Sequence, residues 1–253
     1  MTTNAIDKQR LVVASDSRWS AKLDDDHFLV LDDSGFHKIA QRPVVCLVVA
    51  GDLLLIEAWM DWFRAPVLDL ANPPRLNRWE GLELQYIVFH LVFRNGEIRD
   101  PGYGTLDFNN EARFAGTGAE YARDCYAQRR CVKTSVTTAS GSDVRTGGTV
   151  LHVEVATGDT NVPPVTSNAA QVRNDMVQRG SVMNSKTRQP VCDYQEFIAR
   201  KAAAGTVNAE AANFTISAPT GAKPFEWSPE QKAELMQAFA LVDSLERKAD
   251  NEH

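Results

Sequence analysis

The chain has 253 residues, of which 43% are hydrophobic and 24% are charged. These proportions predict an ordinary globular protein with one large domain, or one domain and an extension. Its 27 Lys and Arg against 33 Asp and Glu give a net charge of −6, and this acidic balance argues against nucleic acid as the main partner. No apolar run approaches the ~18 residues of a membrane span. The polar start predicts no signal peptide, so we expect a cytoplasmic protein without a membrane partner.

The cysteines and histidines show none of the local spacings of a zinc site. The four cysteines are Cys46, Cys125, Cys131 and Cys192. Their scatter predicts unpaired thiols in a reducing compartment. We therefore expect neither a metal nor a cofactor.

The first third of the chain is predicted to form short strands. Residues 11–14 are a small apolar run. Residues 28–31 and 36–39 flank the turn-forming sequence at 32–35 and predict a hairpin. Residues 44–49 are apolar at every position, which predicts a strand covered on both faces.

The middle of the chain mixes helices and strands. Helical spacing of apolar residues predicts a core-facing helix over residues 53–63. Clean alternation over residues 149–155 predicts a strand with one buried face. The remaining predictions are a short helix at 80–84, a strand at 86–93 with a turn at 94–97, an apolar piece at 114–115, and a helix at 119–130. This order suits two sheet layers with helices packed outside.

From about residue 158 the composition of the sequence changes. Residues 158–190 have weak periodicity, 193–204 predict a helix, and 213–216 look like a strand. A final helix begins near Ser228, with Pro at its first position and Gln231 completing a capping box. Its apolar stripe is predicted to dock on this subunit or a neighbour and consists of Leu235, Phe239, Val242 and Leu245.

Several scattered residues could carry chemistry when taken together. Thr2 follows the initiator Met, Asp16-Ser17-Arg18 follows a short strand, and Lys38 lies in a strand. Glycine-containing turns lie at residue 51, at 116–118 and at 147–148. Each feature alone is common, and a Thr at position 2 or an Asp in a turn needs no functional explanation. Their order and spacing point to one site.

This pattern resembles the β-type subunits of proteasomes and their bacterial relatives, the HslV peptidase and, most closely, the bacterial proteasome homologues. The resemblance covers roughly residues 2–157. It rests on Thr2-Thr3, the run at 12–18, Lys38, Ala50-Gly51-Asp52, Gly116-Thr117-Gly118 and the run at 143–148. The resemblance implies an α+β fold, the four-layer αββα sandwich of the N-terminal nucleophile hydrolases, with a C-terminal extension. It divides the chain into a core of residues 1–157 and a part at 158–253 that holds closing strands and a polar, partly helical extension.

The resemblance also implies a threonine-type endopeptidase. Thr2, freed of Met1, would be both nucleophile and, through its α-amine, general base. Lys38 would stabilise negative charge at the Thr2 hydroxyl, with Asp16 holding it in place. The backbone N–H of Gly51 would donate to the oxyanion. The residues that would orient the amine are Thr117, Asp143 and Thr146, two of which stand where many relatives carry serine.

Partners follow from the same resemblance. A peptide or unfolded chain is the implied substrate, a homo-oligomeric ring the implied assembly, and an ATP-driven unfoldase a partner by analogy alone. This sequence departs from the pattern of that family in two ways. The segment between Gly118 and Asp143 is short for two full helices, and the extension after residue 157 is unexplained.

Other functions remain open or are disfavoured. A proteasome-like fold could serve as an inactive assembly protein with Met1 in place, and a small-amide hydrolase could use the same nucleophile. The sequence at 116–121 is similar to a dinucleotide-binding loop, but Tyr121 replaces its third glycine. No G-x-S-x-G elbow is present, neither Cys125 nor Cys131 has a nucleophile signature, and the acidic run at 24–26 lacks the spacing of a calcium loop.

Overall fold

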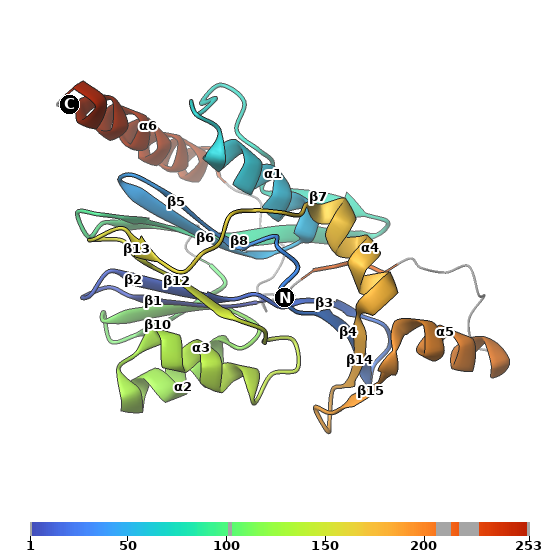
Figure 1. Cartoon of the computed structure of the whole chain (residues 1–253). Coiled ribbons are helices and arrows are strands. Elements are labelled where there is room, and N and C mark those ends of the chain that lie inside the picture. Colours follow the sequence, from blue (N-terminus) through green and yellow to red (C-terminus); the bar gives the residue numbers. More distant parts are fainter. Residues whose placement is uncertain (1, 101–102, 206–213, 218–227, 252–253) are drawn as a thin grey trace.

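The computed structural model describes residues 2–100, 103–205, 214–217 and 228–251. Within these ranges the chain is a mixed α+β protein with three antiparallel sheets and six helices (Figure 1). The α+β class predicted from the sequence is confirmed.

The first sheet contains the start of the chain at its centre. Its strands are, in spatial order, β10 (Thr105–Phe108), β11 (Ala112–Gly116), β1 (Thr3–Asp7), β2 (Val12–Asp16), β12 (Val150–Glu154) and β13 (Asp159–Thr160). In β12, Leu151 and Val153 are buried and His152 and Glu154 are half-buried, so the predicted alternation is confirmed.

The second sheet is built around two long buried strands. Its order is β5 (Ile39–Arg42), β6 (Val45–Gly51), β8 (Glu83–Phe93) and β7 (Asn77–Glu80), with β9 (Ile98–Arg99) also paired to β8. Every residue of β6 is buried. The prediction of a strand covered on both faces is therefore confirmed.

The third sheet joins an early hairpin to a later one. Its order is β15 (Pro190–Asp193), β14 (Ser181–Asn184), β4 (His27–Leu31) and β3 (Trp19–Lys22). Because β14 pairs with β4, residues beyond 157 complete a sheet begun by the N-terminal part. The division at residue 157 stays a prediction.

The helices cover the sheets. They are α1 (Leu53–Arg64), α2 (Ala119–Arg129), α3 (Val132–Ser140), α4 (Ala169–Arg179), α5 (Tyr194–Ala203) and α6 (Pro229–Asn251). Both α2 and α3 lie between Gly118 and Asp143, and α3 has nine residues. Among the described residues, no helix combines the length and apolar character needed to cross a bilayer.

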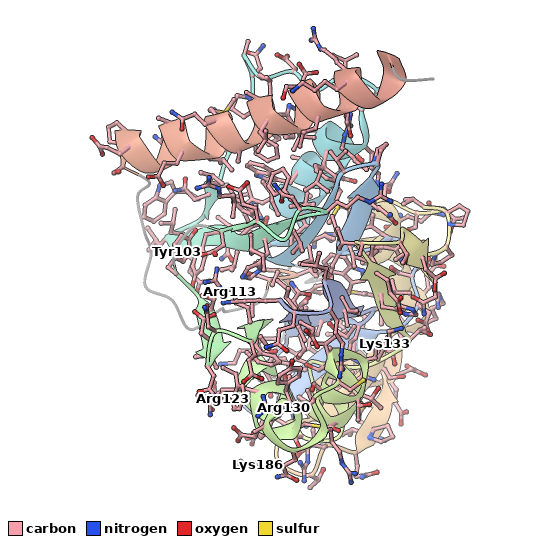
Figure 2. All side chains as sticks on the ribbon, turned by 90° about the vertical axis from the view of Figure 1, so that its left-hand side faces the viewer. Tyr103, Arg113, Arg123, Arg130, Lys133 and Lys186 are labelled. Carbon is pink, nitrogen blue, oxygen red and sulfur yellow. The ribbon has the colours of Figure 1, made fainter. Side chains whose placement is uncertain are left out.

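The two faces of the first sheet meet different partners. Its outer face, with Ala5, Ala14 and Phe114, packs against α2 and α3. Its inner face, with Ile6 and Val13, packs against the second sheet. Figure 1 shows this stack, with α2 and α3 at one side and α1 and α6 at the other. In Figure 2, likewise, α6 lies opposite Arg123 and Arg130 at the α2 side.

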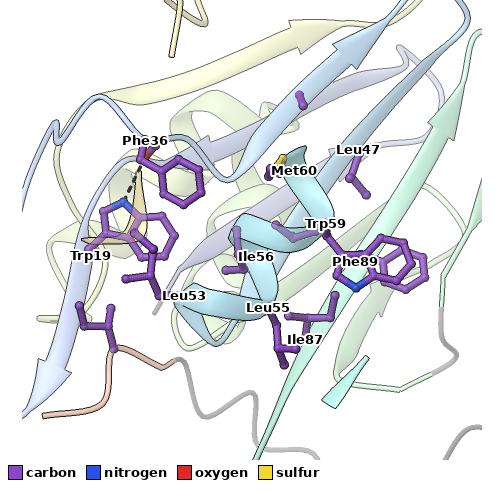
Figure 3. Close-up of a cluster of buried hydrophobic side chains, with 14 of the residues drawn as sticks. Trp19, Phe36, Leu47, Leu53, Leu55, Ile56, Trp59, Met60, Ile87 and Phe89 are labelled. Atoms are coloured by element: carbon purple, nitrogen blue, oxygen red, sulfur yellow. Dashed lines mark hydrogen bonds between the residues drawn. The ribbon is translucent and has the colours of Figure 1, made fainter. Parts of the chain in front are cut away.

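The largest core lies beneath α1. Leu47 and Val49 of β6 and Phe89 of β8 face this helix, and Trp59 stacks on Phe89 with a centroid separation of 5.3 Å (Figure 3). Alternate residues of β6 thus serve two cores, since Cys46 and Val48 face the first sheet. This arrangement explains the uninterrupted apolar run.

The C-terminal helix docks on this core within the same chain. Phe239 is fully buried and meets Trp62 edge-on, with ring centroids 4.6 Å apart. Arg42 of β5 binds Glu246 through its guanidinium. The predicted stripe is confirmed as a buried or half-buried face, and Ser228 accepts from the Lys232 N–H at the helix start. The side chain of Gln231, assigned to a capping box, lies outside the described side chains.

The predicted hairpin of residues 28–31 and 36–39 is wrong. β4 instead pairs with β3 and β14, and β5 pairs with β6. The acidic residues of the predicted turn form other contacts. Arg18 binds Asp32 through two hydrogen bonds of 2.7 and 2.8 Å, and Ser17 donates to Asp33 at 2.6 Å. These bonds hold the segment against the loop after β2, so it crosses from one sheet to another.

The helix predicted at residues 80–84 is also wrong. Glu80 pairs with Glu83 in a tight hairpin between β7 and β8. Gly81 has a φ of +59°, a left-handed conformation that suits a two-residue turn. The strand predicted at 213–216 is wrong over its described residues, 214–216, which form no strand; residue 213 lies outside the described residues.

The helix α4 was not predicted, because its stretch of sequence has weak hydrophobic periodicity. The side chain of Asn168 caps its start.

Truncating the aromatic anchor of α6 tests this packing. We expect Phe239→Ala to lower the free energy of unfolding by about 3–5 kcal/mol, because it leaves a cavity against Trp59 and Trp62. Gln237→Ala, at an exposed position of the same helix, should stay within about 0.5 kcal/mol. Urea unfolding measures both, and equal small effects would show that α6 does not dock as described.

Candidate active site

Most of the residues singled out from the sequence meet at one end of the first sheet. Antiparallel register places Thr3 opposite Gly116, and Asp16 opposite Val150. Asn4 of β1 lies opposite Ser15 of β2. The start of β1 and the ends of β2 and β11 therefore share an edge, and the turn at 143–148 leads into β12 beside them.

The peptide unit between Thr2 and Thr3 is held at both of its polar atoms. Its carbonyl oxygen accepts from the Thr117 N–H at 2.9 Å. Its N–H, on Thr3, donates to Oδ1 of Asp16 at 2.9 Å. Thr2 itself is fully buried, and its hydroxyl has no hydrogen-bond partner in the described part of the chain. The orientation of Thr2 is thus set by the backbone, and its hydroxyl is held by no hydrogen bond from the described residues.

Asp16 is the centre of the first group of contacts. Besides Thr3, it accepts from Nζ of Lys38 at 3.0 Å and from the N–H of Gly147 at 3.1 Å. Both Asp16 and Lys38 are about 1% exposed. A buried carboxylate and ammonium are tolerable only when paired and hydrogen-bonded, so each charge requires the other.

Lys38 is also held by the Arg18 carbonyl and the Trp19 ring. Its Nζ donates to the Arg18 carbonyl at 2.6 Å and lies 5.2 Å from the centre of the Trp19 ring. Trp19 stacks on Phe36 and donates to its carbonyl (Figure 3). Burial lowers the pKa of Lys38 below its usual value, although the charge of Asp16 opposes this change. A lysine in such surroundings is poised to interact with developing negative charge.

Asp143 organises the second group. Thr117 and Thr146 both donate their hydroxyls to its Oδ2, the latter at 3.0 Å, and Arg145 binds its Oδ1 at 2.8 Å. Burial alone would raise the pKa of Asp143, but the charge of Arg145 and the hydrogen bonds from Thr117 and Arg145 outweigh it and lower this pKa. Asp143 is therefore an acceptor for hydroxyl groups.

A contact between two threonine hydroxyls also joins the two groups. The hydroxyls of Thr3 and Thr146 are 2.7 Å apart. Asp16 and Asp143 thus bracket the start of the chain from two sides. At Gly116, φ is +89° and a Cβ atom would collide with the Thr2 carbonyl oxygen, so only glycine permits this approach.

Gly51 lies at the end of β6, opposite Ile87, and takes no part in the hydrogen bonds of this network among the described residues. The residue after it, Asp52, caps α1 and binds Arg78 through two hydrogen bonds of 2.6 and 2.7 Å. This ion pair raises the pKa of Arg78. The backbone from Gly51 into α1 is consequently well anchored.

A cleft of about 980 Å³ opens next to Arg145. Its other walls include Lys22 and Phe28 of the third sheet, Tyr86 of β8 and Thr215. The guanidinium of Arg145 lies 5.6 Å from the centre of the Phe28 ring. This volume is at the upper end of the range for ligand pockets, roughly 300–1,000 Å³, so the cleft has room for an extended ligand.

The structure brings six of the seven predicted site residues into one hydrogen-bonded network, with Gly51 outside it. The sequence reasoning missed the roles of Thr3, Arg145 and the Gly147 amide. All three stand inside motifs that were noted, but their contacts depend on the register of β1, β2 and β12. Met1 lies outside the described residues, as does any contact it makes.

No cluster of three or more His, Cys, Asp or Glu side chains in the described ranges could hold a metal ion. All four cysteines are free, and burial raises the pKa of the Cys46 thiol. A scan against protein-family models finds no matching family, and a search of curated proteins finds no matching sequence.

The dependence of the two buried charges on each other can be measured directly. We expect Asp16→Asn to lower the free energy of unfolding by about 3–5 kcal/mol, because it removes the carboxylate that pairs with the buried Lys38 ammonium. The double variant Asp16→Asn/Lys38→Met should recover at least half of that loss. Strictly additive losses in chemical denaturation would contradict a coupled pair.

The lowered pKa of Asp143 predicts a pH dependence. The unfolded chain protonates this carboxyl near its usual pKa of 3.8, whereas the folded state keeps it ionised to lower pH. The stabilisation is present above that value and is lost as the pH falls through the folded pKa. Asp143→Asn should therefore be less stable than the parent at pH 7, with the difference shrinking towards pH 2. Asp61→Asn, exposed on α1, is the control, and a constant difference across thermal unfolding curves would reject this role.

Proposed function

We propose that this protein is a threonine-type endopeptidase of the N-terminal nucleophile class, and that its stacked sheets and helices form the four-layer αββα sandwich of that class. The observation that carries the proposal is the fixed Thr2–Thr3 peptide unit beside the buried Asp16–Lys38 pair. A structural role alone would not require a buried threonine hydroxyl that has no hydrogen-bond partner in the described part of the chain.

The base in this mechanism is the chain's own amine. Removal of Met1 would convert the Thr2 nitrogen from an amide into an amine, whose reference pKa is about 7.7–8.0. The nearby Lys38 cation would lower that pKa further. Near neutral pH the amine can then accept the proton of the Thr2 hydroxyl, directly or through water, as the oxygen attacks a peptide carbonyl.

The remaining residues would stabilise the developing negative charge or orient the Thr2 amine. Lys38 would stabilise the negative charge that develops at the Thr2 oxygen, and the Gly51 N–H would donate to the carbonyl oxygen of the substrate. Asp143 with Thr117 and Thr146 would orient the new amine. The substrate's amine leaves with the proton held by the Thr2 nitrogen, and water then hydrolyses the ester formed on Thr2.

The cleft beside Arg145 supports a peptide over a small amide as substrate, because Arg145 binds Asp143 of the network and the cleft has room for an extended ligand. By analogy with the proteasome-like peptidases, the proposal includes assembly into a homo-oligomeric ring that admits short or unfolded chains. An ATP-driven unfoldase would be the partner that supplies them.

A second function has one observation in its favour. With the chain intact, Thr2 is completely buried, and no substrate could reach its hydroxyl. If Met1 is retained in the cell, the same fold would serve as an inactive assembly protein.

Replacing Thr2 separates these two functions. On chains shown by intact mass to lack Met1, we expect Thr2→Ala to reduce hydrolysis of unfolded casein and fluorogenic peptides by at least about 10³-fold, and Thr2→Ser to retain measurable turnover. Thr157→Ala, at an exposed position near the far end of β12, should match the parent. Size-exclusion chromatography should give one assembly state for all. Undiminished activity in Thr2→Ala, or retention of Met1 throughout an active preparation, would refute the peptidase.

A further inference from the structure

A short segment near the C-terminal part of the chain lies against the backbone that follows Gly51. In residues 214–217 the side chains alternate: Phe214 and Ile216 are 7% and 2% exposed, while Thr215 and Ser217 are half-buried. This period of two is typical of an extended backbone. Thr215 and Ser217 line the cleft beside Arg145, so the segment forms part of its wall.

The segment is attached through the main chain to the start of α1. The Ile216 carbonyl accepts from the Leu53 N–H at 2.9 Å. Leu53 is the first residue of the helix, and its N–H has no acceptor within the helix. Asp52 caps the N–H of Leu55 instead. The segment thus takes a backbone donor at the start of α1 that would otherwise need another acceptor.

Side chains hold the segment at its other end. The Phe214 ring meets Tyr194 of α5 edge-on, with centroids 5.7 Å apart, and the Arg173 guanidinium of α4 lies 5.2 Å from its centre. The segment is therefore seated by specific contacts from α1, α4 and α5.

The position of this segment conflicts with a bound peptide. Leu53 lies two residues after Gly51, and the intervening Asp52 is extended, with φ −75° and ψ 135°. Two residues of an extended chain span roughly 6.6 Å. A peptide whose reacting carbonyl lies at the Gly51 N–H would therefore bring a second carbonyl, two residues along, to the Leu53 N–H. Ile216 already occupies that donor.

We propose that residues 214–217 are a built-in competitor that occupies the place of a peptide along residues 51–53 and must leave before an extended substrate binds. This inference rests on the proposed function, since it assigns Gly51 to the reacting carbonyl. When only a fraction of molecules has this place free, the apparent affinity for the peptide falls by that fraction. The segment then raises KM for extended peptides and leaves kcat unchanged.

Displacing the segment tests the proposal. Ile216→Asp places a charge in a buried site and should expel the segment, whereas Ile216→Val keeps it seated. On chains lacking Met1, we expect Ile216→Asp to lower KM for a hexapeptide substrate at least about fivefold, with kcat within about twofold. Turnover of a single-residue amide, too short to reach the Leu53 N–H, should not change. Hydrogen exchange at the Leu53 amide should become faster in the Asp variant alone.

Faster exchange at Leu53 with an unchanged KM would overturn the proposal, because the segment would then move without competing. If Ile216→Asp does not fold, Ile216→Ser provides the same comparison with a smaller perturbation. Binding distinguishes failure here from failure of the peptidase assignment. In a Thr2→Ala background, a fluorescent hexapeptide should bind at least about fivefold more tightly when Ile216→Asp is added, whether or not any variant hydrolyses peptides. Equal affinity refutes the competitor.

Discussion

The buried carboxylate of Asp16 is the constraint on which the rest of this structure depends. It receives a backbone N–H from Thr3, the ammonium of Lys38 and a backbone N–H from Gly147. These donors come from three widely separated parts of the sequence. Because a charge in the interior is expensive unless fully bonded, the fold must bring all three together. The geometry at the start of the chain is thereby a consequence of folding itself.

The same requirement explains the irregular parts of the fold. Residues 32–38 cannot close a hairpin, because Asp32 and Asp33 are engaged by the loop after β2 and Lys38 must reach Asp16. Gly116 has to lack a side chain so that the Thr2 carbonyl can approach. The regular sheets supply the rigid frame, and the connections between them carry the polar contacts that define the site.

Residues 214–217 give a second example of a backbone N–H that is paired with a distant part of the chain. The first N–H groups of a helix need acceptors from outside the helix, and at α1 one acceptor comes from the chain's own later part. A protein that hydrolyses extended peptides would benefit from such an arrangement, since an occupied peptide site limits unwanted cleavage. Stability and access to the peptide site would then oppose each other, as the Phe214 and Ile216 side chains belong to the main core.

Local patterns in the sequence determined the elements with strong periodicity or uniform burial: the helix at α1, the doubly buried strand β6, the alternating strand β12 and the amphipathic helix α6. These signals depend on neighbouring residues alone. The sequence also indicated six residues that meet in the network, because their types and order resemble a known arrangement. Only the tertiary structure decided that β3 and β4 form the early hairpin, that Thr3, Arg145 and Gly147 complete the site, and that residues 214–217 bind the start of α1. Those features depend on strand register and on contacts between residues far apart in the chain, which no local pattern encodes.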